Sequence, residues 1–148
     1  MVPPPKRRQH SAPPITIAAR ALSWSGALHI FPNTDDGNPG EPYQSLIIQA
    51  QIVRHDSGKL GAIEISEITI HTRNGAACQA ELSGYMDIRG AELSVNVWIG
   101  LHAFVFATQL LGAGKPLFLI ISAQEFRYRR SVPISFCFQT HFSEEDYF

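Results

Sequence analysis

The chain has 148 residues and a hydrophobic content of 45%, enough for one domain with a core that needs no metal or disulfide support. Charged residues make up 17% of the sequence, a composition that argues against disorder of the whole chain. The formal net charge of −1 weakens the long-range field that would attract nucleic acid.

The N-terminal residues differ from the rest in composition. Residues 1–14, MVPPPKRRQHSAPP, contain five of the ten prolines and three of the twelve Lys and Arg residues, and no acidic residue. Such a segment buries too little apolar surface to offset the entropy of ordering it. The sequence therefore predicts a basic, proline-rich N-terminal arm over 1–14 and a single β domain over 15–148.

Cysteine usage indicates a reducing compartment. Cys78 and Cys137 form no C-x-x-C pair, which excludes zinc-ribbon and thioredoxin-like sites built from them alone. We interpret both as buried thiols that act as small apolar residues. Prolines follow the basic residues of the arm and Arg20 interrupts the next apolar run, so no export signal is recognised and a cytoplasmic protein is predicted.

Beyond the arm, apolar residues recur mainly with a period of two, which is typical of β-strands. Alternation is clear over residues 46–53 and strongest over 132–142, where Pro133 indicates a strand that begins at an edge or in a turn. Further strands are expected over 15–31, 63–70, 85–88, 93–99 and 116–127.

Local sequence signals predict how these strands are joined. The parity of the isoleucines changes within residues 63–70, which predicts a β-bulge at Ser66 and Glu67. Asn74-Gly75 is the strongest short hairpin signal, and Arg89-Gly90-Ala91 indicates a second tight turn. The sequence thus predicts an antiparallel β-sandwich or a partly open β-barrel of about seven strands, with one helix near residues 101–111.

The predicted helix is apolar on nearly every face, which is typical of a buried helix, although the same residues could also extend as a strand. The motif LLGAGKP at its end looks like a phosphate-binding loop. However, Gln109 stands where the Walker pattern needs its first glycine, and Pro116 stands where it needs Ser or Thr. We interpret the motif as a helix stop, with Gly112 or Gly114 at positive φ.

Residues 93–111 contain no Asp, Glu, Lys or Arg, and this run is close to the length that spans a bilayer. Polar residues are spread through it and Gly100 interrupts it, so a buried strand that leads into the helix is expected, and no membrane span. The run is long enough that part of it is expected to lie in an interface.

No cofactor or metal is predicted. The six histidines lack the local spacing of a zinc site, but His29, His71 and His141 lie opposite in parity to their apolar neighbours. If their strands were adjacent, these three would form a zinc or acid/base cluster. The polar loop around Asp35 and Asp36 lacks the ligand positions of an EF-hand and leaves open only a looser calcium site.

Basic residues gather in two places, each suited to phosphates or to an acidic partner. The arm contributes one cluster, and a second, interleaved with an aromatic residue, lies late in the chain. Alternatively, the basic arm of one subunit meets the acidic C-terminus of a neighbour, or the second cluster is an ordinary solvated turn. The candidate residues are Lys6, Arg7, Arg8, Arg127, Tyr128, Arg129 and Arg130.

No spacing marks a nucleophile, a Ser-His-Asp set or a pair of catalytic carboxylates, so the sequence favours a non-enzymatic role. The preferred hypothesis is a protein-protein interaction or assembly module, a homo-oligomer or a partner of another protein, in which the N-terminal arm docks on its partner. The alternatives are a nucleic-acid-binding β domain that uses the two basic clusters, and an enzyme or small-ligand-binding barrel whose site assembles across strands.

Overall fold

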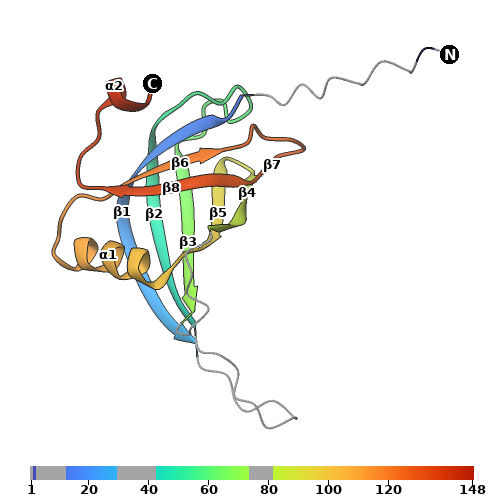
Figure 1. Cartoon of the computed structure of the whole chain (residues 1–148). Coiled ribbons are helices and arrows are strands. Elements are labelled where there is room, and N and C mark those ends of the chain that lie inside the picture. The colour runs from blue at the N-terminus through green and yellow to red at the C-terminus, as the bar shows by residue number, and fades with distance from the viewer. Residues whose placement is uncertain (1, 3–12, 30–42, 74–81) are drawn as a thin grey trace, which may run out of the picture.

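The structure is a computed structural model that describes Val2 and residues 13–29, 43–73 and 82–148. It is mainly β, as the alternating pattern predicted, and the predicted helix is present (Figure 1). The elements in chain order are β1 (Ile15–His29), β2 (Tyr43–His55), β3 (Ile65–Arg73), β4 (Ser83–Arg89), β5 (Glu92–Trp98), α1 (Leu101–Gly112), β6 (Phe118–Ala123), β7 (Arg130–Ser131), β8 (Pro133–Gln139) and α2 (Glu144–Tyr147).

All eight strands belong to one sheet, in the order β7-β4-β5-β3-β2-β1-β6-β8. Figure 1 shows β6 and β8 running across β1, β2 and β3, so the sheet curls over on itself. β7 and β8 lie at opposite ends of the sheet order, yet only Val132 separates them in the chain. The backbone therefore joins the two ends and gives a nearly closed barrel, within the predicted fold class. β8 is an edge strand, which confirms the interpretation of Pro133.

One strand pair departs from the predicted antiparallel meander. β3 pairs with β5 in parallel, and β4 pairs with β5 and β7. A hairpin across Asn74-Gly75 that joins neighbouring strands is therefore wrong, because β3 and β4 are not neighbours; the two residues themselves lie outside the described part of the chain. The second predicted turn is confirmed, since Gly90 has a φ of 62° between the paired strands β4 and β5.

The core fills the inside of the barrel with apolar residues from six of the strands, β1 to β6, and with Phe104 of α1. The bulge predicted at Ser66 and Glu67 is wrong, because β3 keeps an unbroken register with β2. The inward position of Ser66 explains the change of parity: its buried hydroxyl donates to the Leu93 carbonyl at 2.9 Å. Register shifts occur instead where β1 pairs with β2, one between Ala18 and Ala19 and one between Ala21 and Ser23.

The end of α1 has the structure expected from LLGAGKP. Ala113 is the C-cap, and Gly114 follows with a φ of 69°. The Gly114 N–H donates to the Leu111 carbonyl at 3.1 Å, and the Lys115 N–H donates to the Leu110 carbonyl at 3.0 Å. These two bonds form a Schellman motif, which satisfies the terminal carbonyls of the helix. The motif is therefore a helix stop that leads into β6.

The C-terminal segment returns to the outside of the barrel through aromatic contacts. The Phe142 ring lies 6.0 Å from that of Phe118 on β6, and 6.2 Å from each of the rings of Tyr147 and Phe148. The Arg54 guanidinium of β2 lies 5.4 Å from the centre of the Phe148 ring. The segment thus contacts β6 and β2, the two strands that flank β1 in the sheet.

Within the described residues no helix is long and apolar enough to cross a membrane. Cys137 is exposed on β8, so its interpretation as a buried thiol is wrong; it lies on the outward-facing parity of an edge strand. Cys78 lies outside the described residues.

Candidate functional site

The second half of β1 forms an edge. β6 pairs with Ile15 to Arg20, and the Ala21 N–H donates to the Leu117 carbonyl at 2.9 Å. From residue 22 onward, the sheet pairings within the described part of the chain join β1 to β2 alone. This edge, residues 22–28, reads LSWSGAL and contains no charged residue and no proline. Natural sheet edges usually carry such residues because they prevent pairing with another chain.

Apolar side chains on this edge are exposed to solvent. Trp24 is 47% exposed although it pairs with Ile48, whose side chain is fully buried in the barrel. Leu28 is also exposed. A cavity of about 410 Å³ lies at this end of the barrel, and both residues line it together with Phe104 and Thr108 of α1. The apolar face of β1 and the helix therefore border one opening.

α1 differs from its prediction in burial. It was expected to be buried on nearly all sides, but of its twelve residues only Phe104 and Ala107 are buried. Val105 and Phe106 are 41% and 48% exposed. α1 lies beside the strands of the barrel (Figure 1), and its residues Phe104 and Thr108 line the opening beside β1. A surface helix normally carries charge on its outer side, and α1 has none.

We name these exposed apolar residues the α1–β1 face. Its members come from the part of β1 that pairs with β2 alone among the described residues, and from exposed positions of α1. They are Leu22, Trp24, Leu28, Val105 and Phe106.

The second candidate surface is the hairpin of residues 127–130, which sequence analysis singled out. The N–H groups of Arg127 and Arg130 each donate to the carbonyl of the other, at 2.8 and 3.0 Å. The two residues between them, Tyr128 and Arg129, have φ values of 52° and 66°. A two-residue turn with positive φ at both positions normally contains Asn and Gly, so this turn holds its side chains at a cost in backbone energy.

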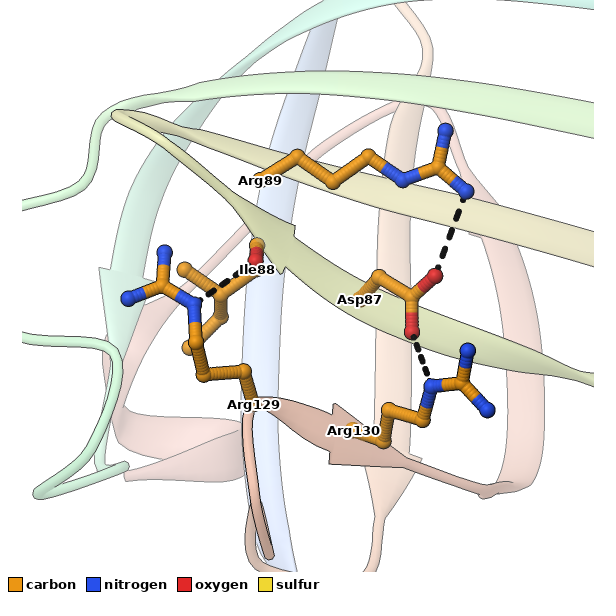
Figure 2. Close-up of polar contacts among 5 residues, drawn as sticks. All are labelled: Asp87, Ile88, Arg89, Arg129 and Arg130. Atoms are coloured by element: carbon orange, nitrogen blue, oxygen red, sulfur yellow. Dashed lines mark hydrogen bonds and ion pairs between the residues drawn. The ribbon is translucent and has the colours of Figure 1, made fainter.

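The arginines of this hairpin have different partners (Figure 2). Arg130 points to Asp87 on β4, with Nε 3.2 Å from Oδ1, and Arg89 contacts Oδ2 of the same carboxylate at 3.3 Å. Arg129 points away from Asp87 (Figure 2) and donates from Nε to the Ile88 carbonyl at 3.0 Å. It also donates to the Gly90 carbonyl at 3.3 Å. Arg89 and Arg130 therefore share the one carboxylate of Asp87, while Arg129 donates to carbonyl oxygens.

A cavity of about 510 Å³ lies on the Arg129 side of the hairpin, and we name it the hairpin pocket. Three cationic side chains line it, with Tyr128 and an apolar floor; the lining residues are Lys59, Ile63, Ile88, Gly90, Phe126, Arg127, Tyr128 and Arg129. The structure thus brings Arg127, Tyr128 and Arg129 together in one pocket and turns Arg130 away from it. Lys6, Arg7 and Arg8 lie outside the described residues.

No sequence pattern identified Lys59 as a candidate binding residue. It belongs to the loop between β2 and β3, whose position depends on a contact with residues far along the chain: Glu125 Oε1 accepts from the Lys59 N–H and from the Ser57 hydroxyl, both at 3.2 Å. Nothing local in the sequence indicates that this loop and residues 125–129 are neighbours. The sequence shows only that Lys59 is a lysine within a segment of turn-forming residues.

The candidate histidines have separate surroundings. His71 Nδ1 lies 2.7 Å from Ser45 Oγ, and His71 Nε2 lies 3.1 Å from Asn96 Oδ1. The Asn96 oxygen accepts, so Nε2 donates and Nδ1 accepts from the Ser45 hydroxyl. Trp98 stacks on the imidazole at 4.7 Å. Ser45 is only 4% exposed, so its hydroxyl is not an accessible nucleophile. The hydrogen bonds of Ser45, His71 and Asn96 instead connect three strands of the sheet.

Metal candidates are not assembled in the described part of the chain, where no three His, Cys, Asp or Glu residues form a group that could hold an ion. His141 is exposed in the segment after β8. The side chain of His29, and Asp35 and Asp36 of the loose calcium site, lie outside the described residues. Comparisons of this chain with family models, with curated proteins and with solved structures find no match.

Proposed function

We propose that the protein is a non-enzymatic assembly module that forms a homodimer through the α1–β1 face. One observation carries the proposal: an uncharged helix on the surface exposes Val105 and Phe106 to solvent, and other residues of this helix line one cavity with a strand edge that has no charge either. Large exposed apolar surfaces of this kind mark interaction sites. The proposal refines the expectation that part of the uncharged 93–111 run lies in an interface.

The edge of β1 at residues 22–28 offers backbone hydrogen bonds, which set the orientation of a partner strand. Seven residues of a β-strand span roughly 24 Å and present backbone N–H and C=O groups to a partner strand. Pairing with a second strand satisfies these groups, and the absence of charged residues from 22–28 removes the usual obstacle to it. The edge therefore favours a partner that adds an extended strand.

A second copy of the chain fits this edge. Antiparallel pairing of two identical edges about a two-fold axis at Ser25 places Trp24 opposite Gly26 of the second copy, which leaves room for the indole ring. Leu22 then lies opposite Leu28 of the second copy. Each apolar side chain meets an apolar or small one, and no charge is buried. Both subunits also contribute α1, so the interface uses one patch twice.

The N-terminal arm has a different place in this proposal. It joins β1 at Ile15, at the opposite end of the strand from the free edge. Most of residues 1–14 lie outside the described residues, and their docking on a partner remains a prediction that is independent of the α1–β1 face. If the dimer persists after deletion of the arm, dimerisation through the α1–β1 face does not depend on docking of the arm.

Light scattering coupled to size-exclusion chromatography tests the dimer. We expect twice the monomer mass for the full chain over a wide concentration range. Phe106→Glu, on the outer side of α1, is expected to give monomers, because dimerisation would bury an unpaired carboxylate. Ser25→Lys is expected to do the same by placing a charge on the edge.

Ile65→Glu is the matched control, because Ile65 is a 60% exposed apolar residue on β3 that lies outside the α1–β1 face. It is expected to leave the dimer intact. Circular dichroism and the melting temperature of the monomeric variants show whether they are folded. A full chain that stays monomeric at high concentration, or a dimer insensitive to both Phe106→Glu and Ser25→Lys, contradicts the proposal.

A further inference from the structure

We propose that the hairpin pocket binds single-stranded nucleic acid, with a backbone phosphate held by Lys59, Arg127 and Arg129 and a base stacked on Tyr128. The inference is independent of the dimer, because these residues lie on the 127–130 hairpin and the β2–β3 loop, away from the α1–β1 face.

The charge of the pocket favours an anion. Lys59, Arg127 and Arg129 all line it, and none of the described acidic side chains does. Within the described residues, the ion pairs involve other arginines, Arg89 and Arg130, both with Asp87. The neighbouring carboxylate of Glu125 accepts hydrogen bonds from the Ser57 hydroxyl and the Lys59 N–H, outside the lining. Three cations against this one carboxylate leave a local excess of positive charge.

The arginines are positioned before any ligand arrives. Arg129 Nε and one of its terminal nitrogens are fixed on the carbonyls of Ile88 and Gly90, which leaves further N–H donors of the guanidinium for a ligand. The Ile88 N–H donates in return to the Arg129 carbonyl at 2.8 Å. On the other side of the hairpin, Asp87 holds Arg130. These contacts fix the turn to β4, so binding orders fewer side chains.

Tyr128 favours nucleic acid over an acidic peptide. Its side chain is 89% exposed at the tip of the turn, and its backbone has a φ of 52° that costs energy for any residue with a Cβ. A glycine at this position would relieve that strain. An exposed aromatic ring beside phosphate-binding cations provides a stacking surface for a base, which an acidic peptide does not need.

The dimensions of the pocket agree with this ligand. A volume of about 510 Å³ lies within the range of small-ligand sites. Its floor of Ile63, Ile88 and Phe126 is apolar, which suits the face of a sugar or base and offers little to a second carboxylate. The overall charge of −1 limits steering at long range, so we expect modest affinity that depends on these three cations.

Fluorescence anisotropy with a labelled oligo(dT) or oligo(U) of about 12 nucleotides tests the site on the full chain, across a salt series. Lys59→Gln and Arg127→Gln are expected to weaken binding, and each is expected to reduce the slope of log Kd against log salt by about 0.7. Lys115→Gln, which removes an exposed cation after α1, is the matched control and is expected to change neither quantity.

Tyr128→Gly separates recognition from stability. It is expected to weaken binding on the order of tenfold, by loss of stacking, with the salt slope unchanged. Its melting temperature is expected to equal or exceed that of the parent, because glycine accepts positive φ. The proposal is overturned if the oligonucleotide does not bind, if Lys115→Gln has the same effect as Lys59→Gln, or if a labelled oligoglutamate of equal charge binds as tightly and is equally sensitive to Tyr128→Gly.

Discussion

Gly84 is the residue at which the fold depends most directly on the absence of a side chain. It lies in β4 opposite Val97 of β5 and has a φ of 145°. A Cβ built on it would lie 2.1 Å from the carbonyl oxygen of Asn96 and 2.8 Å from the Cα of Val97. Both contacts are with backbone, which cannot rotate away. β4 and β5 therefore approach each other more closely here than any other residue would allow.

We expect Gly84→Ala to lower the free energy of unfolding by on the order of 3 kcal/mol or more, because it combines a backbone clash with an unfavourable φ. Gly58→Ala is the matched control: nothing lies within 4 Å of a Cβ at Gly58. Its effect is expected to stay within about 0.5 kcal/mol. Urea denaturation of the three proteins measures both changes, and equal stabilities would show that the strands can separate without loss.

At the scale of elements, the end of α1 was predictable because its cause is local. The glycines and the proline of LLGAGKP act on the backbone within a few residues, and the Schellman motif requires no distant contact. The sequence left open whether Gly112 or Gly114 has positive φ. The structure assigns this role to Gly114 and places Gly112 in the last turn of the helix.

Gly114→Ala and Gly112→Ala form a pair that tests this assignment. Neither Cβ would meet another atom within 4 Å, so only backbone conformation distinguishes the two variants. Gly114→Ala is expected to cost on the order of 1 kcal/mol, since alanine disfavours a φ of 69°. Gly112→Ala is expected to be neutral or slightly stabilising, because alanine favours the helix. Thermal unfolding measures both; the opposite order would place the C′ position at Gly112.

The burial of α1 was not predictable, for a physical reason. An apolar sequence such as 101–111 indicates that water is unfavourable around the helix, but not which surface excludes the water. In this chain the barrel covers Phe104 and Ala107 and leaves Val105 and Phe106 exposed. An apolar helix can be buried by a second subunit as well as by the core of its own chain. Only the three-dimensional structure shows which side chains the core of the chain leaves exposed.

The hairpin pocket shows a similar limit. The sequence of residues 127–130 shows basic residues around an aromatic ring. It does not indicate which of the arginines forms an ion pair with a carboxylate. Asp87 lies some forty residues earlier and reaches Arg130 because β4 pairs with β7. Lys59 enters the pocket through a loop held by Glu125. Both contacts follow from strand order, which the predicted meander had wrong at the parallel β3–β5 pair.

At the scale of the whole molecule, the C-terminal segment covers the outside of the barrel where β1 and β6 meet. Ala18 of β1 and Ile120 of β6 form a cross-strand pair on the outward parity, yet both are buried. Arg54 of β2 is the other cross-strand neighbour of Ala18, and its guanidinium lies over the Phe148 ring. The aromatic contacts of Phe142 with Phe118 complete this cover. Segments at the two ends of the described chain are therefore held together by side chains as well as by the sheet.

Phe142→Ala tests this connection, because its ring contacts Phe118, Tyr147 and Phe148 together. We expect a loss of on the order of 2 kcal/mol, about half the cost of removing a fully buried phenylalanine. Glu145→Ala, an exposed change in α2, is expected to leave the stability unaltered. Hydrogen exchange adds the spatial readout: amides of β6 and of Ile15 to Arg20 should exchange faster in Phe142→Ala, while those of β4 and β5, on the far side of the barrel, keep the protection of the parent. Uniform acceleration across all strands would mean that the segment contributes to global stability without covering this particular junction.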